Sequence, residues 1–340
     1  MSLPPRAERV AAVRALMGPA DSSVRPATLG IRAIPRRNFN TYVEPLIDAT
    51  WPAVRHEPFY EKLRIGACDL YASAPYTVLF CATNAPLVVR LLTAVGGRLP
   101  VPMWALAQLG RAGTQLIGRV ALRGQHKNIV LVAAFIMVVD HVLDQCMQEP
   151  PAERGRLLEA VIQGSLQPWT PELRLTRALA VAMAEGLKGP ERAAFDVALG
   201  ELFAWIHAEV RAMAGAPDPL GFGHHLPGIE GGIDGLLAPL ARYASPAIRA
   251  WMVDVAMFMQ VMDDYLDFEH DAASDRATPV TTGQWTFENV ASTWKETIRG
   301  LEALVCASGH ATVRWVRFIR EIYVLMMIDV MEAMAARPGL

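Results

Sequence analysis

Apolar residues that recur at three- and four-residue intervals dominate the chain from Tyr42 onward. This spacing places them on one face of an α-helix, and no stretch shows the every-second-residue alternation of a half-buried strand. Proline and glycine interrupt the pattern and mark the ends of the predicted helices. The pattern therefore predicts an all-α protein. We expect helices at 42–50, 57–73, 75–95, 103–123, 126–146, 152–164, 171–187, 190–214, 230–242, 246–270, 286–307 and 310–336.

The composition suits a mostly buried helical protein, because the 340 residues are 52% hydrophobic and only 19% charged. This length allows one large domain or two smaller ones. Since no repeat or low-complexity segment interrupts the chain, we expect one compact domain over residues 41–340. Residues 1–40 are rich in Pro and Arg, and we expect a short helix at 7–17 within a partly irregular segment.

The charge and the apolar runs exclude several classes of partner. A net charge of −2 gives no electrostatic reason to expect nucleic acid. The longest apolar run, 129–139, has 11 residues and is too short to cross a bilayer, so we expect no integral membrane protein. The N-terminus lacks the apolar core of a signal peptide, which predicts a cytoplasmic protein. The cysteines lack CxxC spacing and indicate core residues in a reducing compartment: Cys68, Cys81, Cys146 and Cys306.

Two pairs of aspartates stand at the ends of apolar runs, Asp140 with Asp144 and Asp263 with Asp267. On a helix, a four-residue spacing puts both carboxylates of a pair on one face, roughly 6 Å apart. No Lys or Arg lies within four residues of any of these acids. The carboxylates therefore repel each other unless a cation joins them. Oxygen-only ligands favour a hard ion, so we expect Mg²⁺.

The expected metal indicates the kind of substrate. Mg²⁺ is usually held by one or two carboxylates together with phosphate oxygens, so a diphosphate is the simplest choice. The apolar helix before each acidic pair suits an isoprenoid chain, whose allylic carbocation would form in a dry pocket as the diphosphate leaves. Aromatic faces would stabilise that cation by about 0.5–2 kcal/mol each. The aromatic candidates are Phe135, Trp251, Phe258, Trp315 and Tyr323.

The two acidic segments resemble a known pair of motifs. Residues 259–267 read Met-Gln-Val-Met-Asp-Asp-Tyr-Leu-Asp, similar to the Phe-Gln-x-x-Asp-Asp-x-x-Asp motif of trans-isoprenyl diphosphate synthases. Residues 140–144 read Asp-His-Val-Leu-Asp and resemble that family's first motif, Asp-Asp-x-x-Asp, with His141 at the second position. The motifs stand 123 residues apart, about the family's separation. The resemblance implies the isoprenoid synthase fold, a helical bundle around a central apolar cavity, which class I terpene cyclases share.

The resemblance also implies roles for single residues. The four aspartates Asp140, Asp144, Asp263 and Asp267 would be catalytic, as ligands of a cluster of three Mg²⁺ ions per site. Arg276, in the segment Arg-Ala-Thr-Pro, would bind the diphosphate. Phe135, five residues before the first motif, would limit chain length and favour a shallow cavity. The other candidates for substrate binding are Gln260, Asp264, Arg317, Arg320, Phe258 and Tyr323.

Some of these residues have a second interpretation. Asp264 points about 100° away from the metal face, so it pairs with a basic group or orients a ligand. His141 is a ligand, a general base, or a residue tolerated off the metal face. The Met-rich segment 326–334 is core packing or the seam of a homodimer. A basic stripe near the C-terminus closes on the diphosphate or faces solvent: Arg314, Arg317 and Arg320.

The basic residues that hold the second substrate of chain-elongating members are largely missing. Residues 96–98 (Gly-Gly-Arg) match the family's Gly-Gly-Lys-x-x-Arg only in part, Ala133 replaces a His, and no Arg pair follows Asp144. We therefore expect one diphosphate rather than two.

This favours a class I terpene synthase, a lyase that ionises a C10–C20 allylic diphosphate, with C15 slightly favoured, and cyclises or quenches the cation. The Asn-Ser-Glu metal triad usual in such cyclases is absent, so its task would fall to Asp263 and Asp267. The alternatives are a chain-elongating prenyltransferase and a non-catalytic partner subunit of a prenyl synthase.

Overall fold

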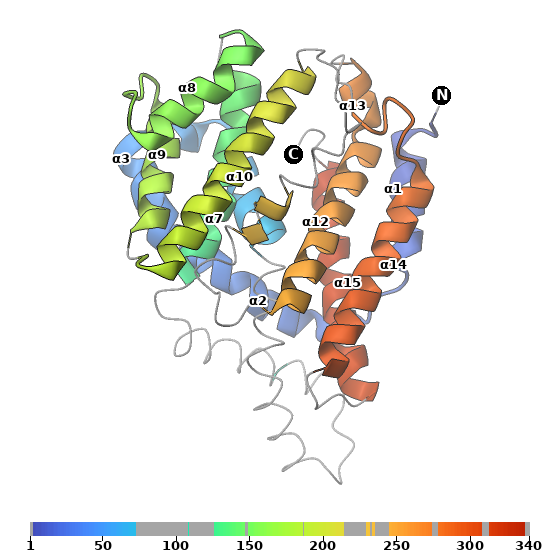
Figure 1. Cartoon of the computed structure of the whole chain (residues 1–340). Helices are drawn as coiled ribbons and strands as arrows, with labels where there is room; N and C mark the ends of the chain where they lie inside the picture. The colour runs from blue at the N-terminus through green and yellow to red at the C-terminus, as the bar shows by residue number, and fades with distance from the viewer. Residues whose placement is uncertain are drawn as a thin grey trace. The chain divides into compact units, whose positions relative to one another are not determined.

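The computed structural model describes residues 3–72, 108, 126–146, 149–185, 187–213, 229–231, 233–234, 245–273, 278–307 and 313–336. Every regular element in these residues is helical, as Figure 1 shows, so the all-α prediction is confirmed for them. The predicted helices at 75–95, 103–123 and 230–242 lie wholly or largely outside the described residues.

Contacts between residues divide the chain into two compact units. Helix α1 (Arg6–Met17) packs on helices from the C-terminal part of the chain and belongs to the same unit as they do. Unit 1 comprises Met1–Ile34, Ser73–Arg123 and Ser245–Leu340, and unit 2 comprises Pro35–Ala72 and Gly124–Ala244.

Unit 1 is built around the pairing of helices α12 and α14, with α1 and α15 packed beside them (Figure 1). Helix α12 begins where Ser245 caps it, since the Ser245 hydroxyl accepts a hydrogen bond from Ile248 N at 3.3 Å and Pro246 occupies the first turn. The other elements are η1 (Ser22–Val24), α12 (Pro246–Leu266), α13 (Phe268–Ala273), α14 (Phe287–Ala307) and α15 (Val313–Ala336).

Unit 2 is built around helix α7 (His126–His141), whose residues from Ile129 to Val139 are buried with the exception of Ile136, which is partly exposed. Helix α7 packs on α9 and on the π-helical turns η2 and η4, and it continues into a third π-helical turn, η5. The elements are η2 (Phe39–Val43), α3 (Glu44–Thr50), η3 (Pro52–His56), α4 (Pro58–Ile65), η4 (Gly66–Tyr71), η5 (Val142–Cys146), α8 (Pro151–Gln163), α9 (Pro171–Ala184) and α10 (Pro190–Met213).

The segment after residue 17, expected to be irregular, contains helix α2 (Arg25–Asn38), so that expectation was wrong. Its two prolines explain the error. Pro26 lies in the first turn of the helix, where the backbone N–H has no intrahelical acceptor, so a proline there costs no hydrogen bond. Pro35 lies inside the helix, where it removes a donor, and three residues later α2 ends and the π-helical turn η2 begins.

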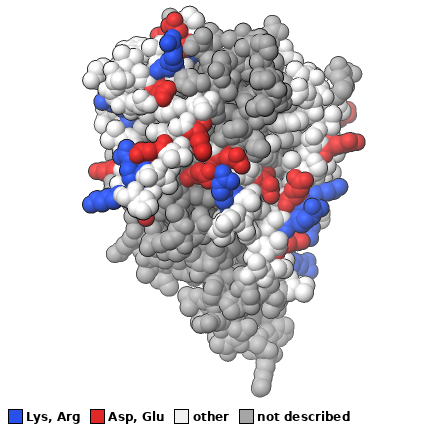
Figure 2. Space-filling model, viewed as in Figure 1, with Lys and Arg blue, Asp and Glu red and all other residues white. Residues whose placement is uncertain are grey.

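The surface carries charged side chains of both signs, and the cysteines differ in burial. On the face shown in Figure 2, acidic and basic side chains of the described residues are interspersed. In the described part of the chain, no helix has both the length and the hydropathy needed to cross a bilayer. Cys68 is buried, as expected, and burial raises the pKa of its thiol to about 12. Cys306 is exposed near the end of α14, so the expectation of a core residue was wrong there.

Candidate cation-binding site

Helix α12 carries three acids at four-residue intervals at and beyond its C-terminal end. The amide of Asp267 donates to Asp263 O at 2.9 Å, and the amide of Asp271 donates to Asp267 O at 3.0 Å, so helical turns link the three residues. Asp263 is partly exposed, whereas Asp267 and Asp271 are each only 6% exposed. The backbone therefore has the helical spacing predicted for the second pair. Asp271 was not singled out from the sequence, although the same four-residue spacing reaches it.

This end of α12 needs positive charge for two reasons. The last carbonyl groups of a helix have no intrahelical donor, and the helix dipole is negative there. The aspartates add full negative charges to the same place. The chain itself supplies two cations to this end, Arg6 and Arg9, both from helix α1.

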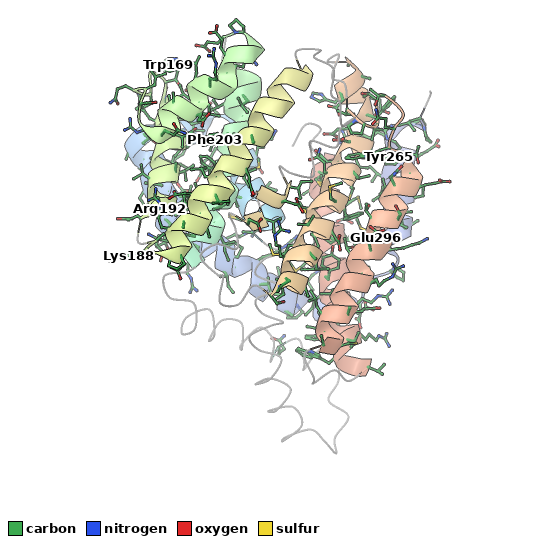
Figure 3. All side chains as sticks on the ribbon, viewed as in Figure 1. Trp169, Lys188, Arg192, Phe203, Tyr265 and Glu296 are labelled. Carbon is green, nitrogen blue, oxygen red and sulfur yellow. The ribbon has the colours of Figure 1, made fainter. Side chains whose placement is uncertain are left out.

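Arg9 is 0% exposed and closes the C-terminal end of α12. Its Nε donates to Tyr265 O at 2.7 Å and its Nη2 donates to Leu266 O at 2.9 Å. Both Nη atoms also bind the carboxylate of Glu269, and this hydrogen bonding lowers the pKa of Glu269. The guanidinium lies 5.8 Å from the ring centroid of Tyr265, which is labelled in Figure 3, and 5.7 Å from that of Phe268. Arg9 therefore caps the helix end as a fixed part of the core.

Arg6 is held more loosely at the neighbouring acid. Its Nη2 lies 3.0 Å from Asp267 Oδ1 and 3.2 Å from Met334 O, near the end of α15. The Arg6 side chain is 25% exposed, and its Nε is buried without an acceptor among the described residues. The sequence predicted that a cation must join these acids and favoured a metal ion. At Asp267 the cation in this structure is a guanidinium.

Gln260 and Asp264 form a pair on another side of α12. The Gln260 amide donates to Asp264 Oδ1 at 2.9 Å, and Asp264 is buried. We expected Asp264 to pair with a basic group or to orient a ligand. In the structure, one partner of its carboxylate is the side-chain amide of Gln260. Gln260 therefore acts first on the orientation of Asp264.

The residues at this helix end fit a Mg²⁺ ion in donor chemistry. Among the described residues, no three His, Cys, Asp or Glu side chains are grouped so that they could hold a metal together. Mg²⁺ commonly takes only one or two carboxylates and fills its remaining positions with water and phosphate oxygens. Asp263 and Asp267 offer such oxygens, and a metal at Asp267 would compete with Arg6 for its Oδ1.

The first acidic pair lies at the end of α7, in unit 2. Asp140 is exposed in the last turn of the helix. The ring of His141 stacks on that of Phe59, with centroids 3.7 Å apart and planes inclined by 11°, and lies 6.0 Å from the ring of Trp51. This contact favours the interpretation of His141 as a packing residue. Asp144 falls in the π-helical turn η5, and its side chain lies outside the described residues.

Phe135 borders a small apolar pocket in unit 2. The pocket has a volume of only about 20 Å³, far below the range for ligand sites, and its lining is wholly apolar. Phe135 is five residues before Asp140, about 7.5 Å along α7. Helices α7, α9 and α10 contribute most of the lining, including Val132, Phe135, Met183, Phe195 and Leu202.

The aromatic candidates of unit 1 pack helices together. The Phe258 ring lies 5.0 Å from that of Trp294, and the Tyr323 ring lies 5.7 Å from Trp294 and 5.5 Å from Trp251. All four are buried, and burial raises the pKa of the Tyr323 hydroxyl. Phe258 is five residues before Asp263 and therefore points about 140° away from it around the helix. In this structure these rings form the contact between α12, α14 and α15.

The structure separates Arg317 and Arg320 from the acids of α12. Arg320 is exposed and pairs with Glu302 at 3.3 Å, and Arg317 is also exposed. Arg320 precedes Met334 by 14 residues and Arg317 precedes it by 17, which is about 21 and 25 Å along α15. Because Arg6 joins Met334 O to Asp267, the two arginines lie far from that carboxylate, and we leave them out of a diphosphate site there. Arg276 and the side chain of Arg314 lie outside the described residues.

Comparison of the chain with protein-family models, with curated proteins and with solved structures found no match in any of the three. The resemblance to trans-isoprenyl diphosphate synthases therefore rests on the two aspartate motifs and their spacing.

Proposed function

We propose that this chain is a Mg²⁺-dependent class I terpene synthase that ionises a C10–C20 allylic diphosphate, with C15 favoured, and cyclises or quenches the cation. The observation that supports this most is the end of α12. A 21-residue helix, buried along much of its length, ends in acids where the chain already holds a cation, at Asp267. Such an end attracts a divalent ion and, through that ion, a diphosphate.

Each part of the chain would then have a defined task. Asp263 and Asp267 would bind Mg²⁺, which when bound supplies positive charge to the departing diphosphate. Arg9 would keep the end of α12 fixed, so that the carboxylates do not move when the substrate enters. In unit 2, Asp140 would act as a carboxylate of the first motif, and Phe135 would limit the length of the hydrocarbon chain, as the resemblance implies.

The test is incubation of the purified chain with geranyl, farnesyl and geranylgeranyl diphosphates, each with and without Mg²⁺. We expect a terpene hydrocarbon or alcohol plus free diphosphate, in the absence of isopentenyl diphosphate and only with the metal, with farnesyl diphosphate turned over best. Longer diphosphates that form only when isopentenyl diphosphate is added would replace this proposal with the chain-elongating prenyltransferase.

Two variants separate the proposed acids from ordinary surface charge. Asp263→Asn keeps the size of the side chain and should lower turnover by about a hundredfold or more, as the loss of a single charge-stabilising group commonly does. Glu302→Gln is the matched control, because Glu302 is a partly exposed acid of the same unit that pairs with Arg320. It should leave turnover unchanged. An Asp140→Asn variant with full activity would contradict both enzyme proposals.

A second candidate function is a non-catalytic partner subunit of a prenyl synthase. The ion pair between Arg6 and Asp267 favours it, because a carboxylate neutralised by its own chain has less need of a metal. Under this proposal no substrate releases diphosphate, and the chain binds a prenyl synthase tightly. Size-exclusion chromatography of the mixed proteins together with the incubation above distinguishes the two functions.

A further inference from the structure

We propose that Arg6 is a diphosphate-binding residue, brought to the acids of α12 by the N-terminal helix. This inference rests on the proposed function. The guanidinium of Arg6 lies 3.0 Å from Asp267 Oδ1, so a diphosphate held beside that carboxylate would lie within its reach.

The two arginines of α1 differ in how their donors are used. Arg9 is 0% exposed, and all three of its guanidinium nitrogens donate to carbonyl or carboxylate oxygens. The Arg6 side chain is 25% exposed as a whole, its two hydrogen bonds both come from Nη2, and its buried Nε has no acceptor among the described residues. Arg6 therefore has donor capacity left, and its side chain reaches solvent.

An arginine suits this task because its planar fork of N–H groups matches two oxygens of a phosphate. The chain needs such a residue. No Arg pair follows Asp144, and Arg317 and Arg320 lie about 21 Å or more along α15 from the carbonyl that Arg6 contacts. Among the described residues of unit 1, Arg6 is thus a cation that contacts a motif aspartate and can still bind an anion.

The charges at this end of α12 also favour a shared site. Five carboxylates and two guanidinium groups give a formal charge of −3, so a diphosphate would bind only together with metal ions. With a cation at Asp267, Arg6 would lose its carboxylate partner and would gain an anionic one in the diphosphate. The seven groups are Asp263, Asp264, Asp267, Glu269, Asp271, Arg6 and Arg9.

The experiment is titration calorimetry of the full chain with inorganic diphosphate in the presence of Mg²⁺. Arg6→Gln should weaken diphosphate binding about ten- to a hundredfold, the usual loss for a charge-assisted pair. Arg6→Lys, which keeps the charge and loses the fork, should lie between Arg6→Gln and the wild type. Arg14→Gln is the matched control, since Arg14 is a partly exposed arginine of the same helix that pairs with Glu332, and it should bind like the wild type.

A second titration, with Mg²⁺ alone, separates this role from damage to the metal site. Because Arg6 occupies Asp267, Arg6→Gln should bind Mg²⁺ as tightly as the wild type or more tightly. If Arg6→Gln binds diphosphate with unchanged affinity, Arg6 is only the counter-ion of Asp267 and the inference is wrong. If the wild type binds no diphosphate with Mg²⁺, the proposed function itself fails.

Discussion

Replacing Arg9 with Met should release helix α1 from the end of α12. The substitution keeps an unbranched side chain of similar length in a fully buried position but removes every donor. It leaves the carbonyl oxygens of Tyr265 and Leu266 without the bonds that Arg9 supplies. A buried acceptor that loses its donor costs about 1–2 kcal/mol. The lost pair with Glu269, whose side chain is 51% exposed, adds under about 1 kcal/mol. We therefore expect a loss of roughly 2–5 kcal/mol in the free energy of unfolding.

The assay combines urea unfolding with hydrogen–deuterium exchange of peptides from α1 and from the end of α12. Arg9→Met should raise exchange in both segments and leave α9, in unit 2, as it is in the wild type. Arg14→Met, at a partly exposed position of the same helix where the side chain donates to Gly18 O, should change the free energy of unfolding by about 1 kcal/mol or less. If Arg9→Met unfolds within about 1 kcal/mol of the wild type, below the expected loss of about 2 kcal/mol or more, and α1 exchanges no faster, Arg9 does not hold this helix end.

Two further predictions concern packing and one concerns pH. A Cβ on Gly66 would overlap the buried side chain of Met137, so Gly66→Ala should destabilise by about 1–3 kcal/mol, and adding Met137→Ala should recover part of that loss in a double-mutant cycle. A Cβ on Gly300 would lie 2.8 Å from the Trp251 ring, so Gly300→Ala should lower the melting temperature, whereas Gly200→Ala, where no atom lies within 4 Å, should not. Burial raises the pKa of Asp254, and the negative charge of Glu296 raises it further. The ionised form of Asp254 therefore lowers the stability of the protein at neutral pH. This loss of stability disappears as the pH falls through the raised pKa. Asp254→Asn should therefore raise the melting temperature at pH 7, with a gain that shrinks toward about pH 4; a gain that grows on acidification would contradict the assignment.

Helices α7 and α12 could be predicted from the sequence, because long apolar periodicity is a local property. The ends of these helices were predicted less accurately than their existence. The expected helix 126–146 changes into a π-helical turn at Val142, and the expected helix 246–270 divides at Asp267. A π-helical turn shifts the hydrogen bonds by one residue and leaves no mark in the composition.

The partners of the acids could not be predicted at all. Arg6 and Asp267 are 261 residues apart in sequence, and no local pattern shows which distant helix meets the end of α12. The basic residues of α1 suggested only a Pro/Arg-rich segment of unknown role. In the same way, the ring contact of His141 with Phe59 depends on how α4 packs against α7, which periodicity does not specify.

The most direct test of the account is a structure of the chain determined with Mg²⁺ and inorganic diphosphate. We predict metal ions bound to Asp263 and Asp267, one diphosphate bridging them, and the Arg6 guanidinium turned from Asp267 to the phosphate oxygens. If Arg6 still pairs with Asp267 under saturating Mg²⁺ and diphosphate, with neither ligand bound at these acids, the claim that this helix end is a metal–diphosphate site is wrong.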